Sequence, residues 1–115
     1  MATITEDYCS QEVYRLLREK GFDGEIHTTF DKEGYTQASI TLQMARKWLR
    51  EVHNIDIIAP PQYDGIKWTY SAIIFKLSIP CTEIRLNNNK DKKEEACEAA
   101  IKYCLESLIN NYGNN

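Results

Sequence analysis

The stretch from Ile40 to Ile58 constrains the fold most strongly, because its pattern predicts a helix that runs directly into a strand. At about 100° per residue, six apolar side chains share one arc of about 160°: Leu42, Met44, Ala45, Trp48, Leu49 and Val52. Five polar side chains share the rest: Gln43, Arg46, Lys47, Arg50 and His53. Thr41 is suited to cap the helix, and Asn54 to end it in a left-handed conformation. The residues after Asn54 are mostly β-branched, which favours a strand. A broad apolar helix face joined by a short loop to a strand indicates a two-layer α+β domain.

The chain before this stretch predicts a helix and a hairpin. Ser10 can cap a helix over Gln11–Lys20, which Gly21 ends while Phe22 folds back on its last turn. The next residues predict two strands, 25–30 and 35–39, joined by a loop with glycine at position 34. In the first strand Ile26, Thr28 and Phe30 share one side, which indicates a half-buried strand.

The chain after the central helix predicts two long antiparallel strands. The first is Ile55–Ala59, which the prolines at 60 and 61 end, and the turn is Gln62–Gly65. The second is Ile66–Leu77, a central strand that is buried on both faces near its end. Its apolar residues alternate with polar ones on the opposite side: Ile66, Trp68, Tyr70, Ala72 and Ile74.

The last third predicts a short edge strand and a helix. The strand is Thr82–Leu86; Asp91 and Glu94 then match a capping box that starts a helix reaching about Asn110. An apolar stripe runs along this helix: Cys97, Ala100, Ile101, Cys104, Leu105 and Leu108. We expect Asn111–Asn115 to fray. The whole chain, 1–115, is predicted to be one α+β domain in the order α-β-β-α-β-β-(β)-α, with three helices on one face of a mainly antiparallel sheet.

Composition and charge narrow the class of protein. The chain of 115 residues is 43% hydrophobic and 27% charged, as expected of a globular domain, and its net charge of −3 argues against broad binding to phosphate backbones. No apolar run approaches the length of about 20 residues that a membrane helix needs. The segment Met1–Asp7 lacks the basic start and apolar stretch of a secretory signal. We therefore expect a cytoplasmic protein without a membrane partner.

The four cysteines, Cys9, Cys81, Cys97 and Cys104, form no Cys-x-x-Cys pair. This spacing lacks the usual pattern of zinc and redox sites. We interpret them as reduced thiols that serve as small core residues.

Three stretches together resemble a family of small uncharacterised proteins from gut Bacteroidetes, many of them carried on prophages and other mobile elements. The stretches are Glu12–Asp23, Thr41–Ile55, which is the most specific, and Glu94–Leu105. The resemblance implies a small cytoplasmic accessory protein. It brings no catalytic residue and no cofactor to this chain.

The basic side of the central helix is one candidate site. Arg46, Lys47 and Arg50 could contact nucleic acid, as a basic helix face does in many DNA-binding domains. The alternative is that these residues form an ordinary solvated helix face, and the acidic net charge of the protein favours this interpretation. No helix-turn-helix pattern surrounds these residues, because a strand follows at once.

The aromatic side chains are a second candidate. Tyr63, Trp68 and Tyr70 form the most plausible partner surface, because Tyr63 lies in a turn and is expected to be exposed. Together with Tyr35 and Trp48 they could instead stack on single-stranded nucleic acid. Trp48 falls within the apolar arc and is therefore expected in the core.

Signals for an enzyme are weak. His27 and His53 lie outside metal and nucleophile motifs. A catalytic pair of Cys81 and His53 would require both residues to converge in a cleft. The glycines form no phosphate-binding loop. We expect no catalysis, cofactor or metal.

A sheet covered on one face leaves another face or an edge open, which favours self-association. The sequence thus favours an accessory module that binds a protein partner or itself, with nucleic-acid binding as the alternative.

Overall fold

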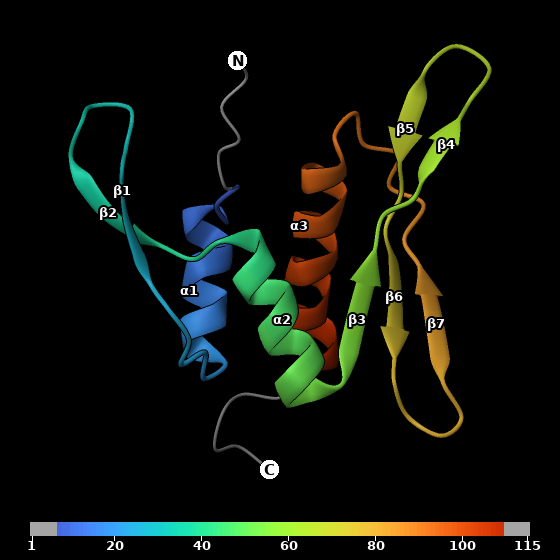
Figure 1. Cartoon of the computed structure of the whole chain (residues 1–115), viewed down its shortest axis with the longest axis horizontal. Coiled ribbons are helices and arrows are strands. Elements are labelled where there is room, and N and C mark those ends of the chain that lie inside the picture. The colour runs from blue at the N-terminus through green and yellow to red at the C-terminus, as the bar shows by residue number, and fades with distance from the viewer. Residues whose placement is uncertain (1–6, 110–115) are drawn as a thin grey trace.

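The structure of the chain is a computed structural model that describes residues 7–109. In this part the helices α1 (Gln11–Glu19), α2 (Leu42–His53) and α3 (Lys93–Tyr103) lie at the centre, and strands flank them on both sides (Figure 1). The strands are β1 (His27–Phe30), β2 (Thr36–Ser39), β3 (Ile55–Ile58), β4 (Pro61–Tyr63), β5 (Trp68–Tyr70), β6 (Ile73–Lys76) and β7 (Thr82–Arg85). The predicted α+β fold with antiparallel strands is confirmed. The strands are divided among three small sheets, β1-β2, β4-β5 and β3-β6-β7.

Helix α1 begins and ends as the sequence predicts. The Ser10 hydroxyl accepts a hydrogen bond from the amide of Val13 at 3.3 Å. At the other end Gly21 has φ of 94°, and the Phe22 amide donates to the Leu17 carbonyl at 2.9 Å. This is a Schellman ending, which turns the Phe22 ring into the core.

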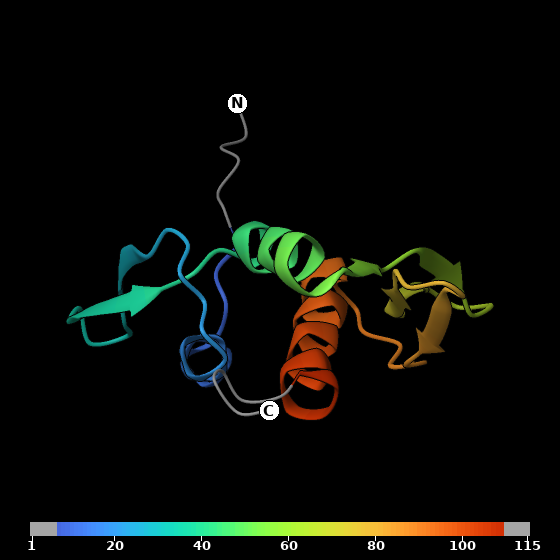
Figure 2. The same cartoon turned by 90° about the horizontal axis from the view of Figure 1, so that it is seen from below.

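Helix α2 packs against α3, which also contacts α1 (Figure 2). The Thr41 hydroxyl caps it by accepting from the Met44 amide at 3.1 Å, and Asn54 ends it with φ of 55°. Four side chains of the predicted apolar arc are buried: Leu42, Ala45, Trp48 and Leu49. The prediction for Val52 is wrong: it is 56% exposed, because the elements that cover this face do not extend over the last turn of the helix.

The sheet β3-β6-β7 has one face toward the helices. In the antiparallel register Ile57 lies opposite Ile74, and Ile74 lies opposite Ile84. Ile57 and Ile74 are fully buried and Ile84 packs on the same core, so these residues form the inner face. Ile58 and Phe75 alternate with them and therefore lie on the outer face. Strand β6 is central, as predicted.

The predicted strand Ile66–Leu77 is interrupted, which corrects the sequence analysis. At the break, the Ser71 hydroxyl donates to Asn89 Oδ1 at 2.7 Å and accepts from the Asn89 amide at 3.0 Å. The amide of Ala72 donates to Asn88 Oδ1 at 3.1 Å. Side chains from the loop before α3 thus replace the strand ladder at this point, and separate β5 from β6.

The burial expected along this stretch is also wrong at its start. Ile66 and Trp68 are exposed, whereas Thr69 and Ser71 are buried. The predicted turn is displaced as well, since Gln62 and Tyr63 belong to β4. The hairpin β4–β5 rises beyond the end of the helices (Figure 1), and Trp68 is exposed there.

The hairpin β1–β2 has the predicted loop but not the predicted burial. The Asp31 carboxylate accepts from the amides of Glu33 and Tyr35, and Gly34 has φ of 88°. The side that carries Ile26 and Phe30 is exposed, with Phe30 at 71%. The hairpin projects from the body next to α1 (Figures 1 and 2), which leaves its apolar side exposed.

The predicted capping box of α3 is absent. The helix begins at Lys93 without a side-chain cap, because the Asp91 carboxylate binds Lys67 instead. After α3 the chain continues as a π-helical turn, Cys104–Leu108, and the predicted stripe is buried apart from Leu108, which is half-buried. The predicted end at Asn110 and the tail Asn111–Asn115 lie outside the described residues.

Candidate interaction surface

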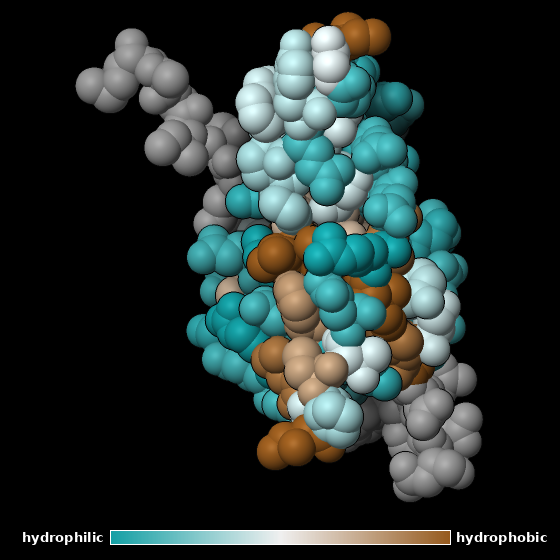
Figure 3. All heavy atoms as spheres, turned by 90° about the vertical axis from the view of Figure 1, so that its right-hand side faces the viewer, coloured by the Kyte–Doolittle hydropathy of each residue, from teal (hydrophilic) through white to brown (hydrophobic). Residues whose placement is uncertain are grey.

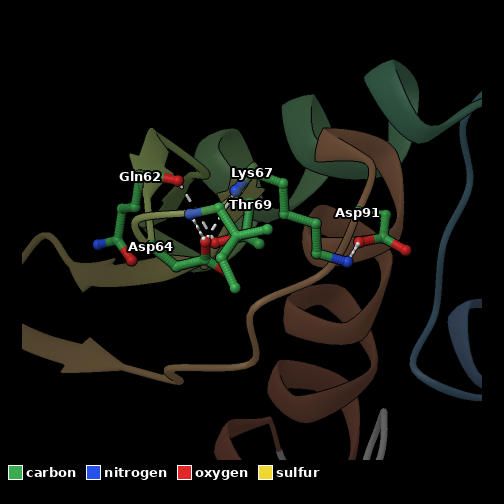
Figure 4. Close-up of polar contacts among 6 residues, drawn as sticks. Gln62, Asp64, Lys67, Thr69 and Asp91 are labelled. Atoms are coloured by element: carbon green, nitrogen blue, oxygen red, sulfur yellow. Dashed lines mark hydrogen bonds and ion pairs between the residues drawn. The ribbon is translucent and has the colours of Figure 1, made fainter.

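The tip of the β4–β5 hairpin is held by one carboxylate. Asp64 Oδ1 accepts from the amides of Ile66 and Lys67, each at 2.8 Å, and the Asp64 amide donates to the Lys67 carbonyl (Figure 4). The hydrogen bonds from Lys67 and Ile66 lower the pKa of Asp64. Gly65 adopts φ of 99°, a conformation that favours glycine. The turn therefore has a defined shape.

The base of the hairpin is tied to the start of α3. The amide of Tyr70 donates to the carbonyl of Lys90 and the amide of Lys90 donates back, both at 2.8 Å. Lys67 Nζ binds Asp91 at 2.6 Å (Figure 4), and this hydrogen bond raises the pKa of Lys67. Both side chains of that ion pair are exposed, so the backbone pairing supplies most of the attachment.

Two of the three predicted partner residues form an exposed aromatic pair. Tyr63 lies opposite Trp68 in the register, with ring centroids 5.4 Å apart and planes tilted by 53°. Their exposed fractions are 58% and 59%. Tyr70 shares their face two residues along, but it is half-buried and packs on the core. Tyr70 thus attaches the hairpin to the core, and Tyr63 and Trp68 face solvent.

The sequence analysis missed Ile66 as part of this surface. Ile66 lies at the tip of the hairpin, two residues before Trp68, and is 88% exposed. Its position directly after Asp64-Gly65 was the available signal, since a residue within a tight turn is seldom covered. The edge-on view in Figure 3 shows hydrophobic spheres at the top, where the hairpin lies. We call Tyr63, Ile66 and Trp68 the hairpin surface.

The predicted basic face of α2 is only partly free. Arg46 Nη2 donates to the carbonyl of Ile57 at 2.6 Å, and the side chain is half-buried. Its Nε is buried without a hydrogen-bond partner among the described residues. Lys47 and Arg50 are exposed. The helix therefore presents two exposed cations, Lys47 and Arg50, and the third residue supports β3.

The residues considered for catalysis do not converge. His53 packs edge-on against the Trp48 ring at 4.7 Å, and its desolvation lowers its pKa. His27, at the start of β1, contacts Tyr8 and Glu25. Within residues 7–109 no cluster of three or more His, Cys, Asp or Glu side chains has the arrangement of a metal site.

The cysteines divide into two groups. Cys9, Cys97 and Cys104 are buried, and Cys81 is exposed between β6 and β7. Burial raises the pKa of Cys9 and of Cys104 to about 12 and also raises that of Cys97. The three buried thiols are small core residues, as predicted for the cysteines as a group, and Cys81 departs from that prediction.

A shallow depression of about 390 Å³ lies between the N-terminal end of α1 and α3. Two of its four charged side chains are engaged, and of these Glu98 accepts from the Ser10 amide at 2.6 Å. Lys102 pairs with Glu12 at 2.8 Å, which raises the pKa of Lys102. Neither a histidine nor a cysteine is among the described residues that line the depression.

Comparisons of the chain with known protein families, with curated proteins and with solved structures gave no significant match. Among the helices of residues 7–109, none has the length and apolar character needed to cross a membrane.

Proposed function

We propose that this chain is a non-catalytic interaction module of a mobile element, which binds a protein partner through the hairpin surface. The observation that carries the proposal is the exposed pair of Tyr63 and Trp68 on a hairpin with a defined turn. Large exposed apolar side chains on soluble proteins mark interaction sites when they gather in one place. Here Ile66 extends the pair to the tip.

The construction of the hairpin favours binding. Asp64 holds the turn, and the pairing of Tyr70 with Lys90 holds the base, so little conformational freedom is lost when a partner docks. Tyrosine and tryptophan are enriched among the residues that dominate binding energy at protein interfaces. We therefore expect Trp68 and Tyr63 to contribute most of the affinity.

Nucleic-acid binding by α2 receives less support. Arg46 already donates to the backbone of β3, which leaves Lys47 and Arg50 as the two exposed cations of the predicted basic face, in an acidic chain. Affinity for phosphates grows with the number of cations in contact and weakens steeply with salt. A tight, salt-dependent affinity for DNA or RNA that is lost when Lys47 and Arg50 become alanine would favour this function over protein binding.

The proposed function is tested by site-specific photo-crosslinking in cells. The photoreactive residue p-benzoylphenylalanine replaces Trp68 in one variant and the exposed Arg15 of α1 in a matched control. A protein crosslinked from position 68 and not from position 15 is then purified and its affinity measured directly. We expect Trp68→Ala to weaken that affinity at least about tenfold, as is typical of a dominant interface residue.

Two results would contradict the proposal. One is the same set of crosslinked proteins from both positions, which would mean contact without specificity. The other is an affinity for the purified partner that is unchanged by Trp68→Ala and by Tyr63→Ala, which would place the binding site elsewhere.

A further inference from the structure

The two edges of the sheet β3-β6-β7 differ in how their backbone groups are used. Along an antiparallel ladder, residues whose backbone groups bond to the partner strand alternate with residues whose groups point away from it. The Leu77 amide donates to the Asn54 carbonyl at 2.7 Å, so Asn54 faces β6. By this alternation the amide and carbonyl of Ile57 point away from β6. The Ile57 amide donates to the Asp56 carboxylate at 3.0 Å, and its carbonyl accepts from Arg46. Polar side chains thus occupy groups that a further strand would need at the β3 edge.

The β7 edge has its backbone groups open. The Leu86 amide donates to the Ala72 carbonyl at 3.0 Å, so the alternation directs Thr82 and Ile84 toward β6 and directs Glu83 and Arg85 away. Strand β7 is outermost (Figure 1), and no strand within residues 7–109 pairs with its far side. The amides and carbonyls of Glu83 and Arg85 therefore face outward.

We propose that β7 pairs antiparallel with β7 of a second copy of this chain, about a two-fold axis that passes by Ile84. The hydrogen-bonded residues of such a pair must be Glu83 and Arg85, which leaves three short symmetric registers. Two of them place Glu83 opposite Glu83 or Arg85 opposite Arg85, and like charges directly opposite are unfavourable. The third places Glu83 of each copy opposite Arg85 of the other. It also uses the outward amides and carbonyls of both residues.

The side chains fit this register on both faces. Glu83 and Arg85 already pair within one strand at 2.9 Å while 42% and 58% exposed, so a second copy would extend the pair into a four-charge network. On the inner face the two Ile84 side chains meet at the axis, at a position where opposed residues approach most closely. The result is a continuous six-stranded sheet, β3-β6-β7-β7-β6-β3.

Charged residues on an edge strand often serve to prevent pairing. Here the negative charge of Glu83 and the positive charge of Arg85 complement each other in one symmetric register. The edge at which polar side chains block pairing is the β3 edge. The view onto the β7 side in Figure 3 shows hydrophobic spheres between hydrophilic ones rather than a uniformly hydrophilic rim. The contact is short, below the roughly 1,200 Å² of a standard interface, so the dimer is weak and depends on concentration.

Sedimentation equilibrium of the full chain, over a range of concentrations reaching millimolar, tests this pairing by charge reversal. Glu83→Arg and Arg85→Glu each place like charges opposite one another twice, and each should raise the dimer dissociation constant at least about tenfold. The double variant Glu83→Arg/Arg85→Glu restores both oppositions and should recover dimerisation. Arg15→Glu on α1 is the control for the change in net charge, and should leave the constant unaltered.

Amide hydrogen exchange supplies a readout that locates the contact. The amides of Glu83 and Arg85 should gain protection as concentration rises, whereas those of Thr82 and Ile84 should be protected throughout. A monomer at every concentration, or a dimer indifferent to the single reversals, would overturn the proposal. The hairpin surface shares no residue with this edge, so Trp68→Ala should leave the dimer intact and the two proposals fail separately.

Discussion

Three isoleucine-to-alanine substitutions should separate the inner face of the three-stranded sheet from its outer face and from the hairpin. Ile74 on β6 is 0% exposed between Ile57 and Ile84. Ile58 on β3 lies on the outer face and is 39% exposed, and Ile66 at the hairpin tip is 88% exposed. The chemical change is identical in all three, so differences in unfolding free energy report burial and packing.

The expected magnitudes follow from these exposures. Ile74→Ala removes three buried carbons at about 0.8 kcal/mol each and leaves a cavity, so we expect a loss of about 3–4 kcal/mol. Ile58→Ala removes the same atoms from a partly solvated site without a closed cavity, and we expect about 1 kcal/mol. Ile66→Ala should lie within about 0.5 kcal/mol of the parent.

Urea unfolding followed by far-UV circular dichroism measures all three losses. The slope against urea should stay constant, because each substitution is expected to change the stability and not the surface exposed on unfolding. Against a total stability of about 5–15 kcal/mol, all three variants should remain folded. A loss for Ile58→Ala equal to or larger than that for Ile74→Ala would refute the assignment of the two faces.

Three further outcomes are expected. Burial lowers the pKa of His53 in the folded chain below its ordinary value of 6.5, so the unfolded chain binds the proton more readily. The stability that comes from keeping His53 neutral is fully present above pH 6.5 and is lost as the pH falls through the folded pKa. Urea unfolding at several pH values should show that His53→Gln reduces this dependence. A thiol reagent at neutral pH should modify Cys81 quickly in the native chain, and Cys81→Ser should abolish the fast reaction because the other thiols are buried. Asp64→Ala should speed amide exchange at Ile66 and Lys67 while leaving global unfolding nearly unchanged, since the carboxylate acts only within the exposed turn.

Local signals in the sequence predict the helices well because their determinants are close in the chain. Thr41 and Asn54 each act within a few residues, as does the Schellman ending at Gly21, and all three are confirmed. The capping box failed because its acid, Asp91, has a competing partner in Lys67, 24 residues away in the sequence. No local pattern reveals such a competitor.

The strands were harder because alternation gives two faces without saying which is covered. At Ile26 and Phe30 the apolar face is the exposed one, because that hairpin has no neighbouring layer. Ile66–Leu77 alternates without a local break, and the interruption comes from Asn88 and Asn89 in a loop that follows later. Both outcomes depend on contacts that are distant in sequence.

The candidate site was predictable in part. The turn signal at Asp64-Gly65 correctly marked Tyr63 as exposed, but Trp68, which lies opposite Tyr63, is exposed although its strand pattern placed it among the apolar residues. Tyr70 was grouped with them, but it packs on the core whereas Tyr63 and Trp68 face solvent. Arg46 illustrates the opposite case, since a residue on the polar arc of a helix turned out to support a neighbouring strand.

The solvent accessibility of Trp68 tests the preformed hairpin surface most directly. Trp48→Phe leaves Trp68 as the sole tryptophan, and Trp68→Phe leaves Trp48, which is 7% exposed. We expect the fluorescence of the first variant to be red-shifted and quenched by acrylamide several-fold more efficiently than that of the second. Equal quenching, or a Trp68 that is protected in the isolated chain at low concentration, would mean that the aromatic pair is packed away and unavailable to a partner.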